Sequence, residues 1–192
     1  NSSHIPYVLV IIGLIIALFV VLNKNQNNTT ESNTKNQVLN SNVQATLVDG
    51  GHILPLETEK ELLSTLIANG VIDPNKLQQI TELNLFWALG FANENPVLDN
   101  GPIADPQYGG VMNIASVGGW TVSQGSPMDH YNKHSLVTLT KDQQALVEKV
   151  AKGIYRPCCD NSTYFPDCNH GMAMLGLLEL LASWGATEDQ LW

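Results

Sequence analysis

Residues 169–184 read NHGMAMLGLLELLASW, and this stretch predicts the last long helix of the chain, with Gly185 where the helix ends. Four small residues lie among its apolar side chains: Gly171, Ala173, Gly176 and Ala182. Small residues let another backbone approach closely, which indicates tight core packing. Glu179 is the only charge between Gly171 and Gly185. We therefore expect a helix buried on most sides, in which Glu179 needs a partner or an exposed edge.

The sequence before this stretch predicts further helices. Residues 57–69 place four apolar side chains on one helical face, with Gly70 behind them. Asp73-Pro74 is typical of a helix start, and the pattern that follows predicts one helix to about Gly90. Capping boxes predict two more helix starts, at Thr140-x-x-Gln143 with an end at Gly153 and at Thr187-x-x-Gln190.

Residues 94–139 differ from the helical parts on either side. They contain Pro96, Pro102, Pro106, Pro127 and the pairs Gly109-Gly110 and Gly118-Gly119. The segments 111–117 (VMNIASV) and 136–140 (LVTLT) are candidate strands. We expect residues 43–192 to form a mainly α globular head with this long irregular insertion, which has room for a small β hairpin.

The N-terminal part predicts a membrane anchor and a tether. Residues 5–22 read IPYVLVIIGLIIALFVVL, 18 residues without a charge. A helix of that length spans about 27 Å, close to the hydrocarbon core of a lipid bilayer, so residues 1–22 are predicted to form a single-pass transmembrane anchor. Residues 23–42 hold eight Asn and predict a flexible tether. Sequons at Asn27, Asn28 and Asn161 are glycosylation candidates, and we expect an extracytoplasmic head.

Composition restricts the classes of function. The chain has 9 basic and 18 acidic residues and a formal net charge of −9, which disfavours a nucleic-acid partner. Three cysteines in 192 residues are too few for a scaffold built from disulfides.

The candidate site is a cluster of cysteines followed by a histidine. Cys158, Cys159 and Cys168 lie within eleven residues, and His170 comes two residues after the last of them. Cys168 and His170 are predicted to lie at or near a helix N-terminus, where free N–H groups stabilise a thiolate. Thiolate with imidazole suits zinc or copper. The leading hypothesis is therefore a membrane-anchored metal-binding protein with a structural, metal-handling or electron-transfer role.

Two upstream histidines are further candidate ligands. His130 and His134 are four residues apart, so on a helix they would share a face, and Asp129 would be placed to orient one ring. They are second choices after the cysteines and His170.

Three alternatives use the same residues differently. One disulfide would join Cys168 to either Cys158 or Cys159 and leave a single thiol. A thiol-dependent enzyme would use Cys168 as the nucleophile, with one of the histidines as its base. Finally, a long apolar helix followed by a head is also the layout of pilin-like subunits, so the protein is a candidate homo-oligomer or subunit of a surface filament or membrane complex.

Overall fold

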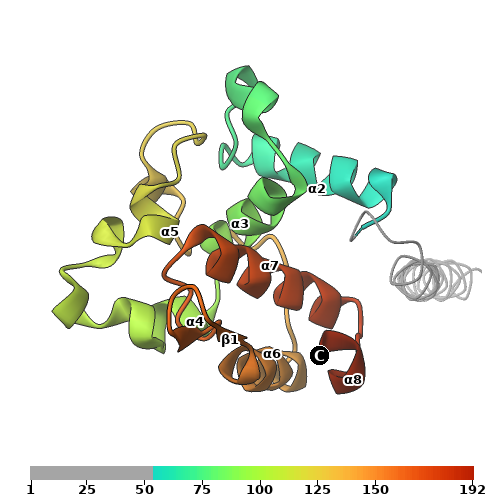
Figure 1. Ribbon diagram of the computed structural model, residues 1–192. Coiled ribbons are helices and arrows are strands. Elements are labelled where there is room, and N and C mark those ends of the chain that lie inside the picture. The colour runs from blue at the N-terminus through green and yellow to red at the C-terminus, as the bar shows by residue number, and fades with distance from the viewer. Residues whose placement is uncertain (1–53) are drawn as a thin grey trace, which may run out of the picture. The chain divides into compact units, whose positions relative to one another are not determined.

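The computed structural model describes residues 54–192, and they form a mainly helical unit (Figure 1). The predicted anchor, tether and sequons of residues 1–53 lie outside the described residues. Within residues 54–192, no helix combines the length and the apolar content that a membrane crossing requires. The α-helices are α2 (Leu56–Ala68), α3 (Glu82–Ala92), α4 (Pro96–Asn100), α5 (Ala115–Gly118), α6 (Lys141–Gly153), α7 (Asn169–Ser183) and α8 (Glu188–Leu191). The 3-10 helices are η1 (Pro74–Gln79), η2 (Pro102–Ala104), η3 (Pro106–Tyr108), η4 (Val111–Asn113) and η5 (Pro127–Asp129).

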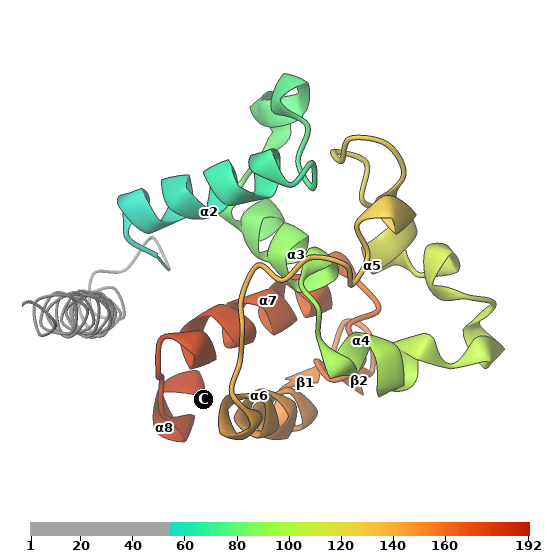
Figure 2. The same cartoon turned by 180° about the vertical axis from the view of Figure 1, so that it is seen from behind.

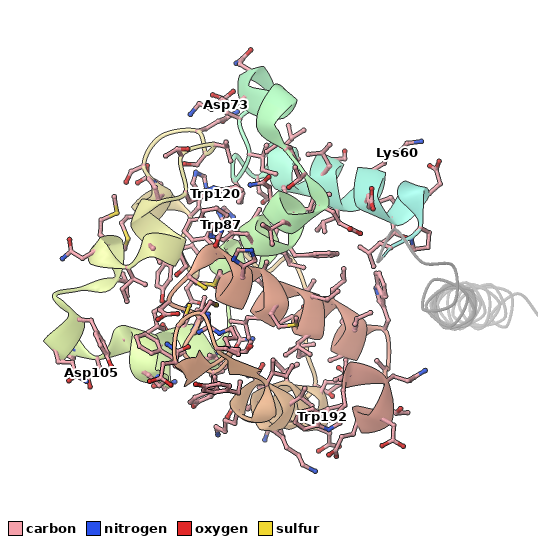
Figure 3. All side chains as sticks on the ribbon, in the orientation of Figure 1. Lys60, Asp73, Trp87, Asp105, Trp120 and Trp192 are labelled. Atoms are coloured by element: carbon pink, nitrogen blue, oxygen red, sulfur yellow. The ribbon has the colours of Figure 1, made fainter. Side chains whose placement is uncertain are left out.

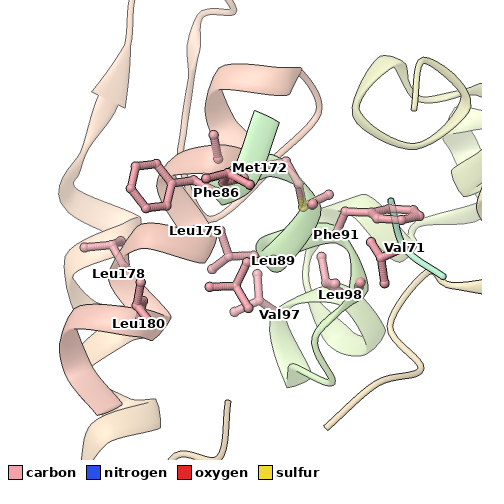
Figure 4. Packing of buried hydrophobic residues seen from close by; sticks show 14 of the residues in the cluster. Val71, Phe86, Leu89, Phe91, Val97, Leu98, Met172, Leu175, Leu178 and Leu180 are labelled. Atoms are coloured by element: carbon pink, nitrogen blue, oxygen red, sulfur yellow. The ribbon is translucent and has the colours of Figure 1, made fainter. Parts of the chain in front are cut away.

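The core is built around the crossing of α3 and α7, with α6 on α7 and α2 on α3 (Figures 1 and 2). Two glycines meet where the helices cross. A Cβ atom on Gly176 would lie 2.3 Å from the carbonyl oxygen of Phe86, and one on Gly90 would lie 2.2 Å from that of Met172. The two backbones are therefore in direct contact, and the predicted tight packing of the last helix is confirmed. Apolar side chains from both helices and from α4 fill the space around the crossing (Figure 4).

Glu179 lies inside this core with no solvent exposure. Its carboxylate accepts hydrogen bonds from the side-chain amides of Asn93, at 2.9 Å, and Asn95, at 2.6 Å. Burial raises the pKa of Glu179 to about 8, although both amides act to lower it. The sequence predicts a partner or an exposed edge for Glu179, and the structure supplies two buried amides as partners.

The helix predicted from Asp73 to Gly90 is wrong, because the chain forms two separate helices there. The first part is the 3-10 helix η1, and α3 starts again after Thr81. The Thr81 side chain caps the new helix together with Asn84, whose Oδ1 accepts hydrogen bonds from the Thr81 N–H and hydroxyl. The predicted helices over 57–69, after Thr140 and over 169–184 correspond to α2, α6 and α7. The last capping box starts the single turn of α8.

Residues 94–139 are irregular as predicted, but neither candidate strand forms. Residues 111–117 contain η4 and part of α5. In the second segment, the N–H groups of Leu136 and Val137 donate to Oδ1 of Asn93 rather than to a neighbouring strand.

Two tryptophans attach the irregular region to the core. Trp87 and Trp120 pack edge to face, with ring centroids 5.0 Å apart (Figure 3). Trp87 Nε1 donates to the carbonyl of Ser116, and Trp120 Nε1 donates to the carbonyl of Val71. These bonds hold the irregular region against α3 and the end of α2.

Candidate metal centre

The three cysteines lie in the loop that joins α6 to α7. This loop contains the two-stranded sheet found in the described residues, in which β1 (Tyr155–Arg156) pairs antiparallel with β2 (Asn161–Ser162), close to α6 (Figure 2). Cys158 and Cys159 lie in the turn between the two strands, where Asp160 adopts a left-handed backbone conformation with φ of 54°. Cys168 is the N-cap residue of α7, as predicted.

The hairpin and the start of α7 bring the three sulfur atoms together. Cys159 Sγ lies 3.4 Å from Cys158 Sγ and 3.3 Å from Cys168 Sγ, and all three atoms lie within 4.8 Å of one another. We call Cys158, Cys159 and Cys168 the three-thiol cluster. Cys158 is exposed, whereas Cys159 and Cys168 are half-buried, so the cluster opens to solvent on the side of Cys158.

Arg156 connects the cluster to the rest of the loop. Its side chain is buried, and Nη1 donates to Cys168 Sγ at 2.8 Å and to Cys159 Sγ at 3.6 Å. Nη2 donates to four oxygen acceptors: Asp167 Oδ1, Asn161 Oδ1 and the carbonyls of Ser162 and Phe165. The guanidinium therefore fixes the loop from both ends and places a positive charge beside the sulfurs.

Three donors converge on the sulfur of Cys168. They are Arg156 Nη1, the Cys159 thiol and the backbone N–H of Gly171 in the first turn of α7, which lies 3.4 Å away. Donors of this kind can orient a metal-bound thiolate. The hydrogen bonds of Cys159 to Cys168 and to Cys158 raise the pKa of the Cys159 thiol to about 12.

Gly171 is required for this arrangement. A Cβ atom at this position would lie 2.3 Å from Arg156 Nη1 and 2.6 Å from Arg156 Cζ. The guanidinium therefore packs directly on the backbone of α7, in space that a side chain at residue 171 would occupy. This close approach lets one cation contact both Cys159 and Cys168.

The spacing of the sulfurs fits a metal ion. An ion that binds two thiolates at about 2.3 Å with tetrahedral angles holds them about 3.8 Å apart. The sulfur pairs 3.3 and 3.4 Å apart would need to separate by about 0.4 Å, and the Cys158–Cys168 pair, which lies within 4.8 Å, would need to close by about 1 Å at most. Side-chain rotations can supply movements of this size. The residues of the cluster can thus hold one ion.

The histidines do not join the cysteines. His170 follows Cys168 on α7, but its side chain is exposed and does not belong to the group of ligand atoms that lie within 4.8 Å of one another. His130 and His134 also lie outside that group and are not on a helix: His130 follows η5 and His134 forms an isolated bridge with Asn93. In the residues that the structure describes, the ligand atoms that lie together are those of the three cysteines.

His130 and His134 instead form a pair of their own. Their rings stack with centroids 5.2 Å apart, and His130 Nδ1 lies 3.0 Å from His134 Nε2. His130 Nε2 is 2.8 Å from the carbonyl of Gln124, which can only accept, so in the neutral pair His130 carries its proton on Nε2. Burial and the neighbouring His130 lower the pKa of His134. The ring nitrogens of His130 contact Gln124 and His134 rather than Asp129, whose Oδ2 accepts from the N–H of Ser126.

The sequon at Asn161 lies within the same loop. Asn161 Oδ1 accepts from Arg156, and its Nδ2 donates to Asp167 Oδ2 at 2.7 Å. Thr163, the third residue of the sequon, is fully buried. The Asn161 side chain thus supports the arginine that contacts the cluster.

Sequence reasoning did not identify Arg156 as part of the site. A signal for it was present, because Arg156 is the one arginine among the 192 residues of the chain and lies two positions before Cys158.

Comparison of the chain with protein-family models, with curated proteins and with solved structures gave no match.

Proposed function

We propose that this protein binds one thiophilic metal ion, zinc or copper(I), through Cys158, Cys159 and Cys168. The observation that carries the proposal is the convergence of the three sulfur atoms within 4.8 Å. Zinc and copper(I) are among the ions that soft thiolate ligands select. The role is structural, metal-handling or electron-transferring, in a protein that the apolar run of residues 5–22 anchors in a membrane with the head outside the cytoplasm.

The hydrogen bonds around the cluster support a metal site. Metal-bound thiolates are commonly held by N–H donors from neighbouring groups, which orient them and offset their charge. Arg156 Nη1 and the N–H of Gly171 are such donors for Cys168. Three protein ligands leave one position open on the exposed side of Cys158, as in sites that exchange or hand over their ion.

A thiol-dependent enzyme receives less support from the same geometry. A cysteine nucleophile needs a base within hydrogen-bond reach, and the hydrogen bonds that Cys168 Sγ accepts come from Arg156, Cys159 and Gly171. His130 has both ring nitrogens engaged, with Gln124 and His134. Among the described residues, a metal ion is therefore the better use of the cluster.

Elemental analysis tests the proposal. The full chain is purified in detergent without oxygen, and zinc and copper are counted per chain. We expect about one equivalent in the wild-type protein and a loss to below about a tenth of an equivalent in Cys168→Ser, because the ion would keep two thiolates only. His170→Ala is the matched control, since this side chain lies outside the cluster, and it should keep its metal.

Two results would contradict the proposal. One is a reduced wild-type protein that neither carries zinc or copper nor takes up Co²⁺ with a thiolate-to-cobalt absorption band. The other is loss of metal in His170→Ala together with retention in Cys168→Ser.

A further inference from the structure

The sulfur contacts of 3.3 and 3.4 Å in the three-thiol cluster both run through one cysteine. This cysteine is Cys159, with contacts of 3.4 Å to Cys158 and 3.3 Å to Cys168. Either contact becomes a disulfide of about 2.05 Å after a movement of about 1.3 Å. The chain contains three cysteines in all, so any internal disulfide leaves one thiol beside it.

Exposure differs among the three cysteines. Cys158 is exposed, and Cys159 and Cys168 are half-buried. A soluble disulfide in the surroundings therefore meets Cys158 first. Arg156 and the N–H of Gly171 hold the sulfur of Cys168.

We propose that the three-thiol cluster carries out thiol–disulfide exchange, with Cys158 as the entry thiol and a Cys159–Cys168 disulfide as the oxidised product. The substrate class is a low-molecular-weight disulfide such as oxidised glutathione. Oxidation would remove two of the three metal ligands, so the same reaction would release the ion; this consequence for the metal rests on the proposed function, whereas the exchange itself does not.

The reaction consists of three exchange steps. The Cys158 thiolate attacks one sulfur of oxidised glutathione, which forms a mixed disulfide and releases one glutathione thiolate. Cys159 gives its proton to the released glutathione thiolate and attacks Cys158 Sγ, which forms a Cys158–Cys159 disulfide and releases the second glutathione as a thiolate. Cys168 gives its proton to this second thiolate and attacks Cys159 Sγ, which forms the Cys159–Cys168 disulfide and returns Cys158 to the thiolate. In total, two protein thiols are oxidised and one glutathione disulfide is reduced to two thiols.

Strain gives the last step its direction. A disulfide between adjacent cysteines has unfavourable geometry, so Cys158–Cys159 is a short-lived intermediate. Cys159 and Cys168 come from different elements, the hairpin turn and the start of α7, and their sulfurs are already in contact. With a reducing thiol in excess, Cys158 can attack Cys159 and reverse the sequence.

Disulfide mapping of the full chain tests the proposal. The reduced protein in detergent is treated with oxidised glutathione, quenched with an alkylating agent and cleaved with chymotrypsin, which can cut after Tyr164 and so separates Cys168 from the other two cysteines. We expect a cross-link between Cys159 and Cys168, with Cys158 alkylated. In Cys158→Ser the same cross-link should form at least about 10-fold more slowly, and in Cys159→Ser glutathione should stay on Cys158.

The controls separate this proposal from the proposed function. Circular dichroism of each serine variant checks that it is folded, and metal content of the reduced wild-type protein is measured independently of the cross-link. A protein that forms the cross-link but binds no metal would support the proposed exchange sequence and would refute only the proposed metal site. A wild-type protein that keeps glutathione on Cys158, or a Cys158→Ser variant that reacts at the wild-type rate, would overturn the exchange sequence.

Discussion

Glu179 makes the stability of the folded protein depend on pH between about 4.5 and 8. Its carboxyl group is fully buried, and burial raises its pKa from 4.5 to about 8. Below pH 4.5 both the folded and unfolded states hold the proton. Between the two values the folded state keeps the proton that the unfolded state has released, so stability falls as pH rises. The free energy of unfolding should fall by about 1.4 kcal/mol per pH unit, or about 5 kcal/mol across the window.

The Glu179→Gln variant removes this proton. Its side chain has one oxygen to accept from Asn93 and Asn95, so one buried amide loses its acceptor, at a cost of about 1–3 kcal/mol at every pH. The variant should therefore be less stable than the wild-type protein at pH 5 and more stable at pH 8. The two stability curves cross within this window.

Urea unfolding followed by tryptophan fluorescence at pH 5, 6, 7 and 8 measures both curves. Glu61→Gln is the matched control, because Glu61 lies on α2 with an exposed side chain, and its curve should run parallel to that of the wild-type protein. If the Glu179→Gln curve also runs parallel to the wild-type curve, the buried carboxyl is not the source of the pH dependence and the reasoning fails.

Two further substitutions test the helix crossing and the arginine. Gly176→Ala places a Cβ atom 2.3 Å from the Phe86 carbonyl oxygen. The overpacking costs about 3 kcal/mol, and the better helix propensity of alanine offsets about 1 kcal/mol of that cost. The free energy of unfolding measured in urea should therefore fall by about 2 kcal/mol. An unchanged urea midpoint would contradict the close crossing. Arg156→Lys cannot reproduce the planar fork that contacts Cys168, Cys159 and four oxygens. With all three cysteines intact, the affinity for zinc, measured by competition with a chromophoric chelator, should fall about 10- to 100-fold. An unchanged affinity would exclude Arg156 from the site.

The helices were predictable where local signals agreed with the core. The capping box at Thr140 starts α6, and the apolar stretch after Cys168 forms α7. The break between η1 and α3 is not visible in the usual capping-box pattern, which has Glu or Gln three residues after the N-cap. Here Asn84 takes that position and accepts hydrogen bonds from Thr81. Apolar periodicity alone does not show where one helix ends and the next begins.

The candidate strands failed because contacts distant in sequence decide the conformation there. The N–H groups of Leu136 and Val137 find their acceptor in the side chain of Asn93, more than forty residues away. A single sequence gives no means of pairing an extended segment with a buried asparagine. The same Asn93 also donates to Glu179, so one side chain connects this segment to the core.

Within the candidate site, spacing predicted the cysteines better than the histidines. The N-cap position of Cys168 follows from the helix after it, and short separation favours its closeness to Cys158 and Cys159. His170 was included because it is near in sequence, but it lies on the first turn of α7 with its side chain exposed. The pairing of His130 with His134 was expected from a helix, whereas a loop in which Asn132 has φ of 53° brings the rings together.

The three sulfurs and Arg156 belong to positions 156–168, a single contiguous stretch of thirteen residues, and Gly171 in the first turn of α7 adds one N–H donor. Closing so short a loop takes little chain entropy. Its ties to the irregular region include the hydrogen bond from the Ser116 N–H to the Asp167 carbonyl and the ring contact of Phe165 with Tyr108. Ion binding, ion release or disulfide formation there would thus reshape one local segment and leave the α3–α7 crossing in place. In kinetic terms the cluster has low contact order and should assemble early, as α7 forms beside it and before the slower long-range contacts are complete.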